Sequence, residues 1–132
     1  MAILSKEKRV NFKKQEIVCQ TVTINPNATT STVTQATNRS TGVTLNTTCG
    51  QITTDATSLA AAAEASFVVT NNKVTAKSVI VINAASGQTA STSIPVVTAV
   101  AAGSFTITLT NLHASTADTG AMVINFIVLG AE

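Results

Sequence analysis

The chain lacks most of the side chains that proteins use for recognition and catalysis. Its 132 residues include no tryptophan, no tyrosine, one histidine, two cysteines and four phenylalanines. Acid–base and nucleophilic catalysis needs groups whose proton affinity can be tuned, and such groups are scarce here. Because hydrophobic residues still make up 45% of the sequence, we expect a core packed from valine, isoleucine, leucine and alanine.

Charged side chains are also few, and they are unevenly distributed. They make up 11% of the sequence, against roughly 25% in an average soluble domain. Most of the surface must therefore consist of threonine, serine, asparagine and alanine, which suits a protein with permanent neighbours. The first fourteen residues hold five basic side chains against one acidic one, namely Lys6, Lys8, Arg9, Lys13 and Lys14 against Glu7.

No group of residues in the sequence has the spacing of a catalytic or metal site. His113 lies near Ser115 and Asp118, but residues this close in the chain seldom converge in the geometry of a catalytic triad, and no nucleophile elbow accompanies them. The single histidine, the two cysteines and the scattered carboxylates match no ligand pattern for zinc or calcium. Phosphate-binding glycine loops are absent too. We therefore expect neither an enzyme nor a cofactor.

The N-terminus gives no sign of export. It has no apolar region of signal-peptide length, and no apolar run of the chain is long enough to span a bilayer. We expect a chain made in the cytoplasm, with no membrane partner. In that compartment two buried thiols at Cys19 and Cys49 are favoured over a disulfide, although a bridge between them stays open.

Short runs rich in valine, isoleucine and threonine follow one another along the chain, separated by glycine, asparagine and proline. Such spacing is typical of an antiparallel β-sandwich. We predict an all-β fold of jelly-roll or immunoglobulin-like type with about seven or eight short strands. A basic, extended arm over residues 1–40 would precede a sandwich domain over 41–132. The runs are 17–24, 42–46, 50–53, 66–70, 78–83, 94–100, 104–110 and 122–129.

Several segments allow sharper predictions. Residues 104–110 alternate strictly, which predicts a half-buried strand with Phe105, Ile107 and Leu109 on its inner face. Pro95 predicts the start of a strand or an edge strand. The runs 42–46 and 50–53 predict two strands joined through residues 47–49, and the alanine-rich segment 55–65 predicts a short helical connection.

The last run, residues 122–129, is apolar on both faces. A strand of this kind lies in the middle of a sandwich or meets another subunit. We favour a subunit contact for one face and assign the strand to the core or to an oligomer interface through Val123, Ile124, Phe126 and Val128.

The basic arm has three interpretations. As a docking arm, Lys6, Lys8, Arg9, Lys13 and Lys14 would pair with an acidic surface while Phe12 is buried in the partner. As a nucleic-acid binder it would lack a stacking platform, since Phe12 is its only aromatic residue and the rest of the chain carries no basic patch. A solvated tail is the third. We favour docking and regard nucleic acid as an improbable partner.

From Val43 to the C-terminus, about two thirds of its length, the chain resembles a small β domain found among the virion structural proteins of tailed bacteriophages. The resemblance consists of packing and turn patterns and transfers no site residues. It does not extend to the arm or to residues 16–40. It rests on 43–46, 50–53, 63–67 with 69–71, 97–105 continuing through Ile107, Leu109 and Asn111, and 123–126.

This resemblance implies a component of the phage particle. One expectation is a capsid decoration (cement) protein, a trimer on the exterior of the head that binds the major capsid protein and stabilises the shell. The alternative is a tail fibre, knob or other appendage that contacts the host surface. The length of the chain and its arm favour decoration, and the lack of tyrosine and tryptophan argues against a recognition surface.

Overall fold

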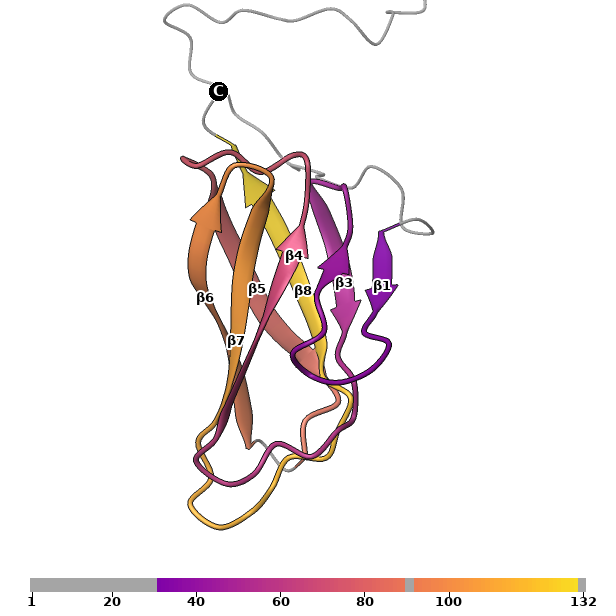
Figure 1. Cartoon of the computed structure of the whole chain (residues 1–132), viewed down its shortest axis with the longest axis vertical. Helices are drawn as coiled ribbons and strands as arrows, with labels where there is room; N and C mark the ends of the chain where they lie inside the picture. Colours follow the sequence, from indigo (N-terminus) through magenta and orange to yellow (C-terminus); the bar gives the residue numbers. More distant parts are fainter. Residues whose placement is uncertain (1–30, 90–91, 131–132) are drawn as a thin grey trace, which may run out of the picture.

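The computed structural model describes residues 31–89 and 92–130, and within these ranges all regular structure is β (Figure 1). Two four-stranded sheets pack against each other, which confirms the predicted all-β sandwich. Sheet A has the order β1 (Thr32–Thr34), β3 (Cys49–Thr53), β8 (Val123–Leu129), β5 (Val79–Ser86). Sheet B has the order β2 (Val43–Thr44), β4 (Glu64–Thr70), β7 (Ser104–Asn111), β6 (Ser93–Ala101).

The long strands pair antiparallel, whereas the two short edge strands do not. β8 pairs with β3 and β5, and β7 with β4 and β6, all antiparallel. β1 runs parallel to β3, and β2 parallel to β4. Both sheets are therefore mixed at one edge, which departs from a fully antiparallel sandwich.

The sandwich begins earlier in the chain than the sequence indicated. β1 lies inside the range predicted as an extended arm, and it places Val33 opposite Ile52 of β3. The expected boundary at residue 40 therefore falls within the sandwich of the structure. The strand predicted at 17–24 and the docking residues of the arm lie outside the described residues.

The strands predicted at 42–46 and 50–53 exist, but they belong to different sheets. The Leu45 N–H donates to the Thr70 carbonyl at 3.0 Å, which keeps β2 beside β4 in sheet B. Three residues later, the Thr48 carbonyl accepts from the Val128 N–H at 2.7 Å and joins the chain to β8 of sheet A. Residues 45–48 thus carry the chain from one sheet to the other.

The predicted helical connection over 55–65 was wrong. β4 already starts at Glu64, and apart from one turn bond, from the Ala63 N–H to the Ala60 carbonyl at 3.2 Å, the preceding backbone bonds to a distant segment. Leu59 and Asp118 exchange two backbone hydrogen bonds of 2.8 and 2.9 Å. The Asp55 carboxylate accepts from the Thr57 N–H and closes a local turn at the start of this segment.

The core lies between the sheets and is built from alternating residues of each strand. Phe105, Ile107 and Leu109 of β7 are buried, which confirms the predicted inner face. Pro95 lies on β6, an edge strand, as its missing N–H requires. The sheets meet at two aromatic rings, because Phe105 of sheet B and Phe126 of sheet A have their centroids 5.6 Å apart.

A glycine gives the Phe126 ring its space. Gly50 stands directly opposite Phe126 in the β3–β8 pairing. A Cβ atom at Gly50 would lie 2.8 Å from the Ser31 carbonyl oxygen and 3.0 Å from Cε1 of Phe126. Since interiors are close-packed, even one added methyl group at this position must displace its neighbours.

We expect Gly50→Ala to lower the free energy of unfolding by ~1–3 kcal/mol, the usual cost of overpacking a core. Gly130→Ala is the control, because a Cβ there would meet no atom within 4 Å. Urea denaturation followed by far-UV circular dichroism measures both, since the chain has no tryptophan for fluorescence. Equal stability of the two variants would show that the Gly50 position has room to spare.

Candidate functional site

The structure does not assemble a catalytic triad from Ser115, His113 and Asp118. The Nδ1 atom of His113 accepts hydrogen bonds from the backbone N–H groups of Ser115, at 3.2 Å, and Thr116, at 2.9 Å. In a triad this nitrogen would donate to the carboxylate. The Asp118 carboxylate is instead buried in a different network, and His113 is exposed, as expected for a loop histidine.

That network centres on a buried ion pair between Arg39 and Asp118. Their side chains are 3% and 0% exposed, and Nη2 of Arg39 lies 3.6 Å from Oδ1 of Asp118. Nη2 also donates to the carbonyl oxygens of Asp118, at 3.1 Å, and Gly120, at 2.7 Å. Nε donates to the Thr57 carbonyl. Arg39 therefore ties together the β1–β2, β3–β4 and β7–β8 connections.

Gln35 extends this network on the same connection as Arg39. Its Nε2 donates to the carbonyls of Arg39 and Thr41, at 3.2 and 2.7 Å, and its Oε1 accepts from the Asp55 N–H at 3.0 Å. Neither Gln35 nor Arg39 was predicted from the sequence as a functional residue. The only signal available was a solitary arginine in a threonine-rich stretch that otherwise has no charge.

Asp118 is held in its ionised form. Oδ1 accepts from the N–H groups of Thr89, at 3.1 Å, and Gly120, at 3.0 Å. Burial on its own raises the pKa of the Asp118 carboxyl. The Ser93 hydroxyl and the two N–H groups outweigh burial, the positive charge of Arg39 adds to them, and the pKa lies below its ordinary value. The carboxylate thus fixes loops and is not available as a general acid or base.

We expect Arg39→Met to lower the free energy of unfolding by about 3–5 kcal/mol, because it leaves the buried Asp118 carboxylate without its counter-charge. Lys77→Met is the matched control, since Lys77 is an exposed cation with no such partner in the described part of the chain. Urea denaturation measures both variants. A small effect of Arg39→Met, similar to that of the control, would contradict a structural role for the pair.

The lowered pKa of Asp118 sets a direction for acid stability. A carboxyl whose folded pKa lies below its unfolded value of about 3.9 stabilises the fold above that pH, and this contribution is lost as the pH falls through the folded value. We expect the free energy of unfolding to fall less steeply for Asp118→Asn than for the wild type between about pH 5 and pH 2. The Thr57 hydroxyl and N–H lower the pKa of Asp55, so the free energy of unfolding still depends on pH in both proteins. If the free energy of unfolding fell equally steeply with pH in both proteins, the prediction would be wrong.

The outer face of sheet A carries a contiguous set of aliphatic side chains. In the β5–β8 pairing, Val79 stands opposite Leu129 and Val81 opposite Ile127. Val79, Val81 and Leu129 are 60%, 49% and 45% exposed, and Ile127 is half-buried. We call these four residues the aliphatic patch. Contiguous exposed apolar side chains of this kind mark interaction surfaces more often than isolated ones do.

A row of amide side chains crosses the same face beside the aliphatic patch. Asn125 of β8 has Asn83 of β5 and Gln51 of β3 as its neighbours in register. The Gln51 Nε2 donates to the Asn125 Oδ1 at 3.0 Å. We call these three residues the amide row. On its β3 side lies a shallow, open hollow of ≈ 320 Å³ lined by Ser31, Thr32, Cys49, Gly50, Gln51, Asn125 and Phe126.

β8, the strand predicted for the core or for an oligomer interface, contributes one of its two faces to the core. Ile124, Phe126 and Val128 point inward and are buried. Val123, with Asn125 and Ile127, lies on the opposite face and is half-buried. Cys49, expected to be a buried thiol, is half-buried on that outer face opposite Ile127, and Cys19 lies outside the described residues.

The outer face of sheet B has a different character. Threonines of β7 line its centre, and the Thr108 hydroxyl lies 2.8 Å from that of Ser66 and 2.9 Å from that of Thr98. The Thr110 hydroxyl donates to the Glu64 carboxylate at 3.2 Å. This face therefore carries a charge and a set of hydroxyl groups that bond to one another.

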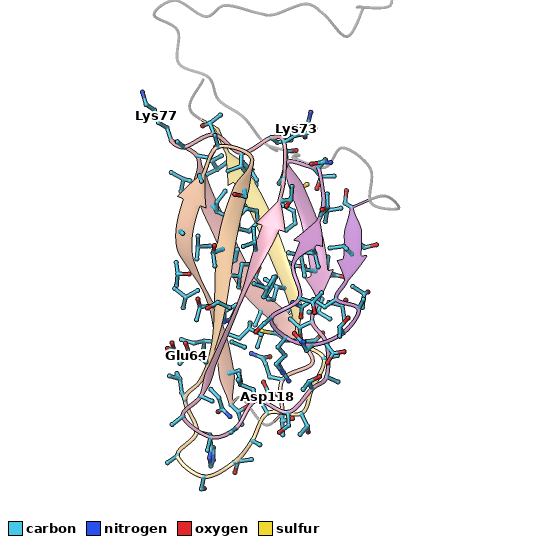
Figure 2. All side chains as sticks on the ribbon, viewed as in Figure 1. Glu64, Lys73, Lys77 and Asp118 are labelled. Atoms are coloured by element: carbon cyan, nitrogen blue, oxygen red, sulfur yellow. The ribbon has the colours of Figure 1, made fainter. Side chains whose placement is uncertain are left out.

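The exposed charges of the described residues gather at the two ends of the sandwich (Figure 2). Lys73 and Lys77 lie in the β4–β5 connection at one end, and Glu64 begins β4 near the other. β1 and β5 start at the lysine end, and β8 ends there (Figure 1). The first described residues, which follow the basic segment in the sequence, therefore enter the sandwich at this end, which we call the basic end.

Comparisons with protein-family models, with curated proteins and with solved structures find no match for the chain. In residues 31–89 and 92–130, no three histidine, cysteine or acidic side chains are grouped so that they could hold a metal ion. The same ranges contain no helix long and apolar enough to cross a membrane.

Proposed function

We propose that the chain is a virion structural protein of a tailed bacteriophage, a capsid decoration protein that binds the exterior of the head and stabilises it through contacts between copies. The resemblance of residues 43–132 supports the setting. The observation that carries the proposal is the distribution of charge. The sheet faces carry one charged residue, Glu64, while the two exposed lysines of the described residues, Lys73 and Lys77, lie at one end.

The basic end supplies the attachment in this proposal. The five basic side chains of the arm precede β1 in the sequence, and β1 begins at the end of the sandwich that holds Lys73 and Lys77. At the opposite end, Asp55 lies in the β3–β4 connection and Glu64 begins β4. An acidic surface of the major capsid protein would therefore bind the basic end and repel the other, which orients the molecule on the shell.

The protein works by binding in this proposal, without catalysis, cofactor or nucleic acid. The one buried carboxylate among the described residues, Asp118, is paired with Arg39 and accepts backbone N–H bonds. These contacts support a structural role, because a carboxylate held by a counter-charge and two backbone N–H groups stabilises the loops that supply them.

Replacing the five basic residues of the arm with glutamine should weaken binding to heads at least about fivefold, since exposed ion pairs contribute ~0.2–1 kcal/mol each. The assay is co-sedimentation with purified heads, and separately with purified tails, of the encoding phage grown without the protein. Glu64→Gln, at the other end, is the control and should bind like the wild type. The variant residues are Lys6, Lys8, Arg9, Lys13 and Lys14.

Two outcomes would count against this function. Unchanged binding of the glutamine variant would overturn docking through the arm. Binding of the wild type to tails and not to heads would overturn decoration and favour the tail-appendage alternative. Far-UV circular dichroism must show the same β content in the variants and the wild type.

A further inference from the structure

The outer face of sheet A has the composition of a surface that is covered. None of the side chains that alternate outward on β1, β3, β8 and β5 is aspartate, glutamate, lysine or arginine. The aliphatic patch occupies the part of this face nearest the basic end, and the amide row lies beside it. Charged residues are depleted at the centres of protein interfaces, so the face resembles one half of such a centre.

We propose that this face is a contact between two copies of the chain, packed face to face about a two-fold axis that runs along β8. The inference rests on the proposed function, since it names the surface through which copies touch. A face without charge meets its own copy without like-charge repulsion, and an amide, which both donates and accepts, is complementary to another amide.

The order of the strands decides where the axis lies. A two-fold axis along β8 places β5 of one copy over β3 of the other, because these strands flank β8. The projecting Val81 then faces the hollow beside Cys49, and Asn83 faces Gln51. Ile127 and Leu129 lie near the axis and meet their own counterparts. The aliphatic patch and the amide row are each matched in this arrangement.

An axis along the strands also has a consequence for attachment. Both copies keep their strands in the same direction, so both basic ends point the same way. Two arms can then bind one capsid surface together, which raises the effective affinity without any new contact. An axis across the strands would point the two basic ends in opposite directions and would place the aliphatic patch against the polar part of the face.

The small area of the face limits the affinity between two copies. Four strands spaced about 4.8 Å apart, with about six residues each, cover roughly 400 Å² in projection. A standard interface buries about 800 Å² per partner, so the free chain should dimerise weakly. Dimerisation must therefore be measured at protein concentrations up to about 1 mM, at which any dimer with a Kd below that value is detected.

Sedimentation of the full-length chain tests the interface with two matched variants. Val81 and Val96 are both exposed valines on edge strands, 49% and 43% exposed, but Val96 lies on the outer face of sheet B. We expect a concentration-dependent dimer for the wild type and for Val96→Lys. Val81→Lys should raise the Kd of the dimer at least about tenfold, because it buries an unpaired charge.

The outcomes separate this inference from the proposed function. A wild type that is monomeric at about 1 mM, or a Val81→Lys variant that dimerises like the wild type, would overturn the interface even if heads are still bound. A dimer that binds no heads would overturn the proposed function alone. If the wild type sediments with the mass of three chains and Val81→Lys with a smaller mass, the two-fold arrangement is overturned in favour of the trimer expected from the sequence.

Discussion

The contact between Phe105 and Phe126 is the constraint on which the rest of the sandwich depends. It joins the two sheets at their centre and requires a glycine, Gly50, opposite the Phe126 ring. Because side chains alternate along a strand, an inward Phe126 also turns Asn125 and Ile127 outward, and a slip of one residue would exchange the two faces. The core contact therefore determines which residues the outer face of sheet A presents.

The ion pair of Arg39 and Asp118 has a similar role at the end of the sandwich that lies away from the basic end. It replaces regular structure in three long connections with hydrogen bonds from one guanidinium group. A buried pair of this kind does not by itself add much stability, but removing either partner is costly. Its value here is to hold irregular loops in one arrangement, which suits a body that serves as a rigid unit of a larger assembly.

The two proposals describe one arrangement of surfaces. In these proposals the basic end would face an acidic partner, and the uncharged face of sheet A would meet a second copy. With the axis along β8, attachment and self-contact would reinforce each other, since pairing would bring two arms to the same side. Charge would then set the orientation of the molecule, and aliphatic contact would set its pairing.

Features that depend only on neighbouring residues could be predicted before the structure was known. The alternation in residues 104–110 predicted β7 and its buried face, and Pro95 predicted an edge strand, because side-chain period and proline geometry are local properties. Three other features could be seen only in the folded chain: β2 and β3 join different sheets, residues 55–63 form no helix, and Arg39 meets Asp118, 79 positions away. These depend on contacts between distant segments, and so does the aliphatic patch, whose two strands are far apart in the chain and adjacent only in the folded sheet.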